Sequence, residues 1–171
     1  MANTFELIAS STVGSGGAAS IDFTSIPSTF TDLCIKLNLR AADSANNWYL
    51  AKVIFNSDNT SGNYSSRFIG AFGSTAYSST STYYCGYIPS GARTANTFGN
   101  NEIYIPNYAG SNQKSSTTDS VTEGNGSSYE ILGLWATKWT GTAAISSISI
   151  ASDTGNLAQY STAYLYGVKN A

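Results

Sequence analysis

The sequence predicts an all-β protein: an antiparallel β-sandwich, jelly-roll-like, with about ten strands. Apolar and polar residues alternate with a period of two along many segments, as expected for strands that bury one face. Clusters of Gly, Asn, Asp and Ser separate these segments at regular intervals, as turns do. No segment longer than about two turns shows the apolar spacing of a helix.

The first three strands are expected at residues 4–9, 18–23 and 32–40. The glycine-rich segment 14–17 precedes a strand and not a helix, so it is predicted to be a turn rather than a phosphate-binding loop. In 32–40 every second residue is Leu or Ile, and these side chains are predicted to face the core: Leu33, Ile35, Leu37 and Leu39. The residues between them are predicted to face solvent: Cys34, Lys36, Asn38 and Arg40.

The middle of the chain predicts a longer strand at 48–55, in which Ala51, Val53 and Phe55 share one face. Shorter strands are expected in three further segments: 66–71, 82–88 and 102–105. Pro106 ends the last of these, because proline cannot donate a hydrogen bond to a neighbouring strand.

The C-terminal part predicts four strands: 115–123, 129–139, 147–150 and 160–168. Segment 129–139 is apolar on both faces, with Ile131 and Trp135 on one side and Leu132 and Leu134 on the other. Two interpretations are open. Either this is a central strand covered on both sides, or one side packs on a neighbouring subunit.

The composition points to one domain, 1–171, that works through neutral polar contacts. Charged residues make up 11% of the chain and the net charge is −2, with no basic run. Nucleic-acid binding and binding to anionic membranes both need clustered cations, so neither partner is expected. No apolar run approaches the ~20 residues of a membrane helix, and residues 1–13 lack the features of a signal peptide.

Conventional catalysis is not expected. The chain has no histidine, which removes the commonest general base and the commonest metal ligand. Asp119 and Glu123 are the best carboxylate pair, but their spacing along a strand is about 13 Å, too far for either glycosidase geometry. Asp58 with Asn56 and Asn59 offers oxygen ligands for calcium but lacks EF-hand spacing. We therefore assign no catalytic, cofactor-binding or metal residue and expect no cofactor.

The two cysteines, Cys34 and Cys85, lie far apart in the sequence. Two free, unreactive thiols is the simpler interpretation. A disulfide stays open, because sequence cannot establish the distance between the two residues.

Aromatic residues make up 13% of the chain, and two roles are open for them. Exposed rings can form a stacking platform for sugars, whereas buried rings belong to the core or to a subunit interface. We expect the buried role for Trp135 and leave the other candidates undecided: Trp48, Tyr77, Tyr83, Tyr84, Tyr87 and Trp139.

Four segments together resemble a group of virion proteins of tailed bacteriophages: 4–10, 18–33, 101–108 and 163–168. The resemblance spans nearly the whole chain, and its motifs are structural. It implies a small β-sandwich or jelly-roll protein of the particle surface, made in the bacterial cytoplasm and labelled in such families as structural, decoration or tail-fibre protein. The resemblance assigns no functional residue to this chain.

The leading hypothesis is a capsid decoration (cement) protein that docks on the major capsid protein, and the resemblance implies that it is a homotrimer. The strand pattern begins at Thr4, and no shaft or coiled coil is expected before it. The alternative is a tail-fibre or receptor-binding subunit that recognises host surface polysaccharide. A polysaccharide-cleaving enzyme is the least expected class, because acid–base residues are so few.

Overall fold

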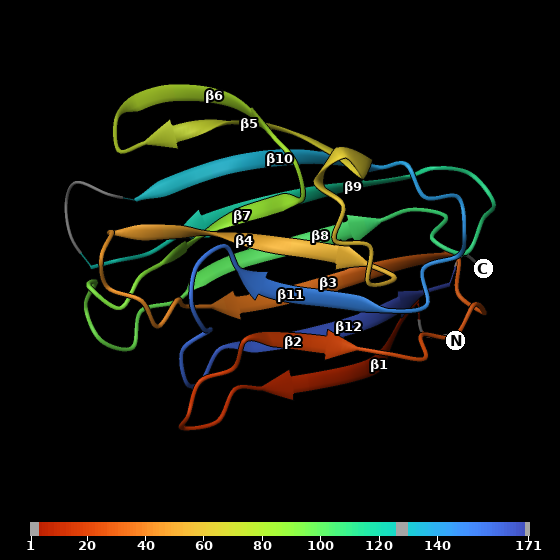
Figure 1. Cartoon of the computed structure of the whole chain (residues 1–171), viewed down its shortest axis with the longest axis horizontal. Helices are drawn as coiled ribbons and strands as arrows, with labels where there is room; N and C mark the ends of the chain where they lie inside the picture. Colours follow the sequence, from red (N-terminus) through yellow and green to blue (C-terminus); the bar gives the residue numbers. More distant parts are fainter. Residues whose placement is uncertain (1–3, 126–129, 170–171) are drawn as a thin grey trace.

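Two antiparallel sheets packed face to face make up the protein (Figure 1). The computed structural model describes residues 4–125 and 130–169. Within these ranges there is no α-helix, only a single 3-10 turn at Ser61–Asn63, and no helix that could cross a membrane. The predicted all-β antiparallel sandwich is confirmed.

The larger sheet has eight strands in the order β1-β12-β3-β8-β9-β10-β5-β6. Their bounds are β1 Phe5–Thr12, β12 Thr162–Val168, β3 Asp32–Leu39, β8 Gly99–Ile105, β9 Lys114–Thr122, β10 Ile131–Trp139, β5 Tyr64–Phe72 and β6 Thr75–Ser81. The smaller sheet has the order β2-β11-β4-β7. Its strands are β2 Ser20–Phe23, β11 Ile148–Ser152, β4 Trp48–Phe55 and β7 Tyr84–Pro89. Most connections cross from one sheet to the other, so strands distant in sequence become neighbours.

Twelve strands are present where about ten were expected. Strand β6 was not predicted, because its sequence is Thr-Ala-Tyr-Ser-Ser-Thr-Ser and buries almost nothing. It is an edge strand held by its register with β5, in which Phe68 faces Ser79 and Phe72 faces Thr75. Residue 129, expected to begin the strand that contains Trp135, lies outside the described residues.

Strand β3 shows where the alternation rule succeeds and where it fails. Its Leu and Ile side chains are buried, and Lys36 and Asn38 are exposed, as predicted. Two predictions of exposure were wrong: Cys34 and Arg40 are both buried. The cross-strand neighbours of Cys34 are Tyr104 and Tyr166, and side chains of that size shield a small thiol on the outer face.

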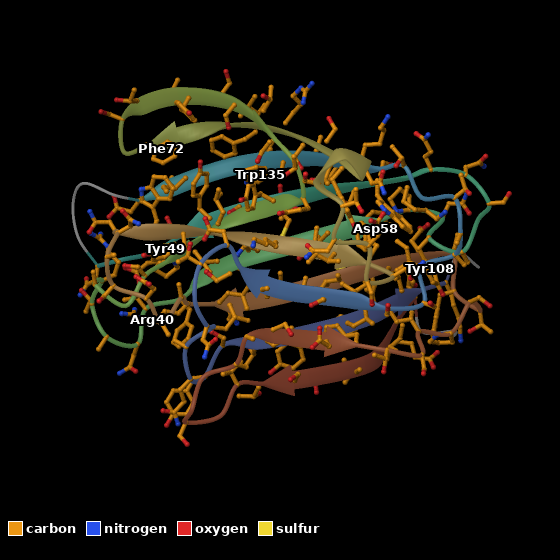
Figure 2. All side chains as sticks on the ribbon, in the orientation of Figure 1. Arg40, Tyr49, Asp58, Phe72, Tyr108 and Trp135 are labelled. Atoms are coloured by element: carbon orange, nitrogen blue, oxygen red, sulfur yellow. The ribbon has the colours of Figure 1, made fainter. Side chains whose placement is uncertain are left out.

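Arg40 follows β3 at the left end of the molecule in Figure 2, where the chain turns into the loops. Its guanidinium group donates to the backbone oxygens of Gly91, Arg93, Thr94 and Thr97 at 2.7–3.3 Å. No carboxylate pairs with it among these contacts. The buried Arg40 side chain therefore stabilises the conformation of the loop between β7 and β8.

Hydroxyl groups fasten the small sheet to the large one along β7. The Ser120 hydroxyl accepts a hydrogen bond from the Tyr87 amide at 3.1 Å, and the hydroxyls of Ser66 and Thr137 donate to the Tyr84 carbonyl. The β7 backbone lies so close to β8 and β9 that a side chain at Gly86 would sit 2.1 Å from the amide oxygen of Asn101. These bonds satisfy backbone groups of an edge strand, and they place serine and threonine inside the protein.

Candidate functional site

Carboxylates on the outer face of the large sheet were the only catalytic candidates. Asp119 lies within β9 and is exposed, and Glu123 follows the end of that strand on the same face. The structure adds Glu102, which is directly opposite Asp119 in the β8–β9 register. Sequence spacing could not indicate this pair, because the two residues belong to different strands.

This carboxylate pair lies on an open sheet surface. Glu102 accepts a hydrogen bond from Lys36 at 2.7 Å, and both side chains are about half exposed. A glycosidase acid is a carboxyl group that burial keeps protonated near neutral pH. The exposed and ion-paired Glu102 lacks that environment.

The oxygens proposed as calcium ligands serve as hydrogen-bond acceptors between loops. Asp58 accepts bonds from the Trp139 indole and the Asn63 amide, both at 2.8 Å, and these two donors hold the pKa of Asp58 below its ordinary value. Asn56 accepts bonds from the Ser146 and Ser147 amides. No group of three or more acidic, cysteine or histidine side chains suited to a metal occurs in the described ranges.

Both cysteines are buried and free. Cys34 belongs to the large sheet and Cys85 to the small sheet. Burial raises the pKa of Cys34 to about 11 and that of Cys85 to about 12. Both groups are therefore protonated near neutral pH, and a thiol nucleophile would need the thiolate.

The aromatic candidates separate into three groups. Trp135 and Trp139 are buried, with Trp135 packed on Phe68 as expected for a core residue. Tyr83 and Tyr84 are half-buried neighbours beside β4. The structure brings three of the candidates together in one pocket: Trp48, Tyr77 and Tyr87.

This aromatic pocket is completed by Phe72 and Thr75 and has a volume of about 280 Å³. It lies between the β5–β6 hairpin of the large sheet and the β4–β7 pair of the small sheet. Phe72 is labelled at the upper left of Figure 2, near Trp135. Sequence reasoning missed Phe72 and Thr75, because the pocket forms only where the β5–β6 hairpin of the large sheet lies beside β4 and β7 of the small sheet.

The aromatic rings in the pocket meet nearly at right angles. Trp48 and Tyr87 have ring centres 4.9 Å apart with an angle of 88°, and Phe72 and Tyr77 are 5.2 Å apart at 83°. Burial raises the pKa of Tyr87 to about 12. The floor of the pocket is therefore neutral and firmly packed, whereas its rim, at Thr75 and Tyr77, is exposed.

A second candidate site is an apolar groove on the outer face of the large sheet. Ile69, Val121, Leu132 and Leu134 are 41–59% exposed. They are cross-strand neighbours, because Leu134 pairs with Ile69 and Leu132 pairs with Val121. These four residues, called the apolar stripe below, line a shallow groove of about 540 Å³.

The apolar stripe bears on the first of the two interpretations left open for segment 129–139. Leu132 and Leu134 are each 52% exposed, so the described chain does not itself cover this strand on both sides. Coverage by another molecule stays a prediction. Exposed apolar patches of this kind mark contact sites in many proteins.

Comparison with models of protein families, with curated proteins and with solved structures finds no match to this chain.

Proposed function

We propose that this protein is a non-catalytic structural protein of a tailed-bacteriophage particle, which docks on the assembled capsid through the outer face of its large sheet. The observation that carries the proposal is the apolar stripe, formed by three adjacent strands. The sequence resemblance supplies the context, a virion surface protein whose partner is the major capsid protein.

The chemistry of the stripe favours a protein surface as its partner. Its four members are aliphatic, and at the edge of the groove only Asp119 carries a charge. Burying apolar area contributes about 25 cal/mol per Å², and a contact of this kind does not depend on ion pairs. We therefore expect docking to survive moderate salt, which screens exposed charges.

A homotrimer on the capsid is part of the proposal and rests on the resemblance. The stripe is a single apolar surface. It cannot be covered by a second copy of the chain and by the capsid at the same time. Light scattering of the purified protein, compared with the same measurement on a stripe variant, separates these two uses.

Particle binding tests the proposal directly. Leu132→Asp places a charge in the stripe, at an exposed position where it does not disturb the core. We expect at least a tenfold loss of co-sedimentation with capsids that lack the protein, together with an unchanged melting temperature. Asn38→Asp adds the same charge to the same sheet face, on β3, and should bind like the wild type.

Heat-driven DNA release measures the consequence of docking. A ligand that binds only the assembled capsid stabilises it by about 2.7 kcal/mol per site at a hundredfold excess over Kd. Capsids with the wild-type protein should therefore release DNA at a higher temperature than capsids with Leu132→Asp. Equal release temperatures, or protein found only at the tail, would refute the capsid role.

The second candidate function is a tail-fibre or receptor-binding subunit. The aromatic pocket favours it, because the stripe does not explain a pocket lined by four aromatic rings, one of them exposed at its rim. Labelling of the protein on intact particles separates the two candidates by position, capsid against tail.

A further inference from the structure

We infer that the aromatic pocket formed by Trp48, Phe72, Thr75, Tyr77 and Tyr87 binds one ring of a neutral saccharide. This inference deepens the second candidate function, and it does not depend on docking through the apolar stripe. The stripe lies on the outer face of the large sheet, and the pocket lies between the two sheets.

The size of the pocket limits its ligand. Ligand sites usually have volumes of ~300–1,000 Å³, and the aromatic pocket, at about 280 Å³, is just below that range. One ring fits such a space, and a longer chain has to continue over the exposed rim. A terminal or protruding sugar of a surface polysaccharide meets this requirement, because one ring can enter the pocket while the rest of the chain stays outside.

The absence of charged side chains at the pocket disfavours anionic ligands and leaves a cation only the aromatic rings to bind. None of its five lining residues is a cation, so a phosphate or carboxylate group would lose its hydration without gaining an ion pair. None is a carboxylate, so a cation would depend on the rings alone. A neutral ligand therefore loses the least hydration free energy on entering this pocket.

The lining chemistry matches the two kinds of surface on a sugar ring. Trp48 and Phe72 offer aromatic faces for the C–H groups, and their ring centres are 5.7 Å apart. Thr75 and Tyr77, which are exposed at the rim, bring hydroxyl groups that can donate to and accept from sugar hydroxyls, and the largely buried Tyr87 lines the pocket beneath them. A purely apolar ligand would leave those hydroxyls without partners, which costs free energy.

The pocket is also held in shape before any ligand arrives. Tyr87 packs against Phe68, Phe72 and Trp135, with ring centres 5.2–5.6 Å apart. Phe68 in turn lies over Gly70 and Gly133, where any added side-chain carbon would meet its ring within 2.6 Å. A preformed site loses little conformational entropy on binding.

Intrinsic fluorescence reports on this site selectively, because Trp48 is the only half-exposed tryptophan of the three. Trp135 and Trp139 are 2% and 4% exposed. The probes are maltohexaose, cellohexaose and dextran oligosaccharides, with tetramethylammonium and inorganic phosphate as charged comparisons. We expect saturable fluorescence changes with at least one neutral oligosaccharide and none with the charged probes.

Three variants make the test specific. Tyr77 is 49% exposed, so Tyr77→Ala removes a rim ring with little effect on the core, and it should weaken oligosaccharide binding about threefold to tenfold. Tyr164→Ala removes an exposed tyrosine on β12, at the far side of the large sheet, and should bind like the wild type. Trp48→Phe keeps a ring in the pocket and should bind more weakly while it still folds.

Three results would overturn the inference. They are binding of tetramethylammonium or phosphate instead of sugars, equal loss of binding in the Tyr77 and Tyr164 variants, and no binding of any neutral oligosaccharide at millimolar concentration. Tyr77→Ala should still co-sediment with capsids like the wild type. A failed sugar titration would therefore leave the capsid result unaffected, and the two ideas can fail separately.

Discussion

Arg40 shows how much one buried side chain can organise. It is 8% exposed, and burial lowers the pKa of its guanidinium group. Five bonds to the loop between β7 and β8 replace the water that the cation loses, one of them to the Thr97 hydroxyl at 3.0 Å. Burying a cation without a carboxylate is costly unless its donors are satisfied, and here backbone oxygens satisfy them.

Arg40→Met is therefore expected to destabilise the protein by about 3 kcal/mol, because it leaves several buried carbonyl oxygens without donors. Urea denaturation measures the free energy of unfolding, and amide exchange should increase first in residues 91–97. Arg67→Met is the matched control: Arg67 is exposed on β5, and its loss should cost less than about 0.5 kcal/mol. Equal effects of the two variants would show that the loop does not depend on Arg40.

Strand β3 allows a test of register at the level of an element. Leu37 is buried between the sheets, and Lys36, one residue away, is about half exposed and paired with Glu102. Leu37→Asp would bury an unpaired carboxylate, and we expect it to abolish soluble expression. Lys36→Asp loses only an exposed ion pair and should cost about 1 kcal/mol or less. Similar behaviour of the two variants would contradict the register, since a shift of one residue exchanges the faces.

Strands β9 and β10 show where part of the serine and threonine content lies, which the sequence alone did not indicate. Serine and threonine are usually found at protein surfaces. The inner face of β9, however, carries buried polar residues in succession: Lys114, Ser116, Thr118, Ser120 and Thr122. Ser120 bonds to the β7 backbone, and Lys114 donates to the carbonyl oxygens of Gly110 and Thr142. Polar alternation therefore marks a strand correctly, but it does not say which face lies inside.

The whole molecule should be insensitive to pH near neutrality and unstable in alkali. No histidine is present to titrate between pH 5 and 8. Burial raises the pKa of Cys85 from 9.0, and that of Tyr64 from 10.0, to about 12 in each case. Three further groups shift in the same direction: Cys34 to about 11, and Tyr87 and Tyr104 to about 12.

A group whose pKa is higher in the folded state gives stability that is complete below its unfolded pKa and is lost as pH rises toward the folded value. Stability should therefore fall from pH 9 and more steeply from pH 10 to 12. Lys114 and Arg40, whose pKa values burial lowers, act in the opposite direction, but they are two groups against the five named above. Urea midpoints from pH 6 to 11 measure this, and Cys85→Ala should flatten the part of the curve above pH 9. A midpoint that rises between pH 9 and 11 would contradict the assignment.

The two candidate sites were partly visible in the sequence. Leu132 and Leu134 stood out because they make their segment apolar on both faces, but their partners Ile69 and Val121 come from β5 and β9 and needed the strand order. Trp48, Tyr77 and Tyr87 were candidates among several aromatics. Their grouping depends on the register of β6, a strand without any alternation of its own.

The sequence by itself determined the fold class, the inward face of strands such as β3, and the scarcity of charge and of histidine, because alternation and composition are local properties that need no knowledge of neighbours. Only the tertiary structure decided that Cys34 and Arg40 are buried, that Glu102 faces Asp119, and that a hairpin closes an aromatic pocket over β4 and β7. Each of these depends on which strands lie side by side. That order is set by contacts between residues far apart in the chain, and no local pattern encodes it.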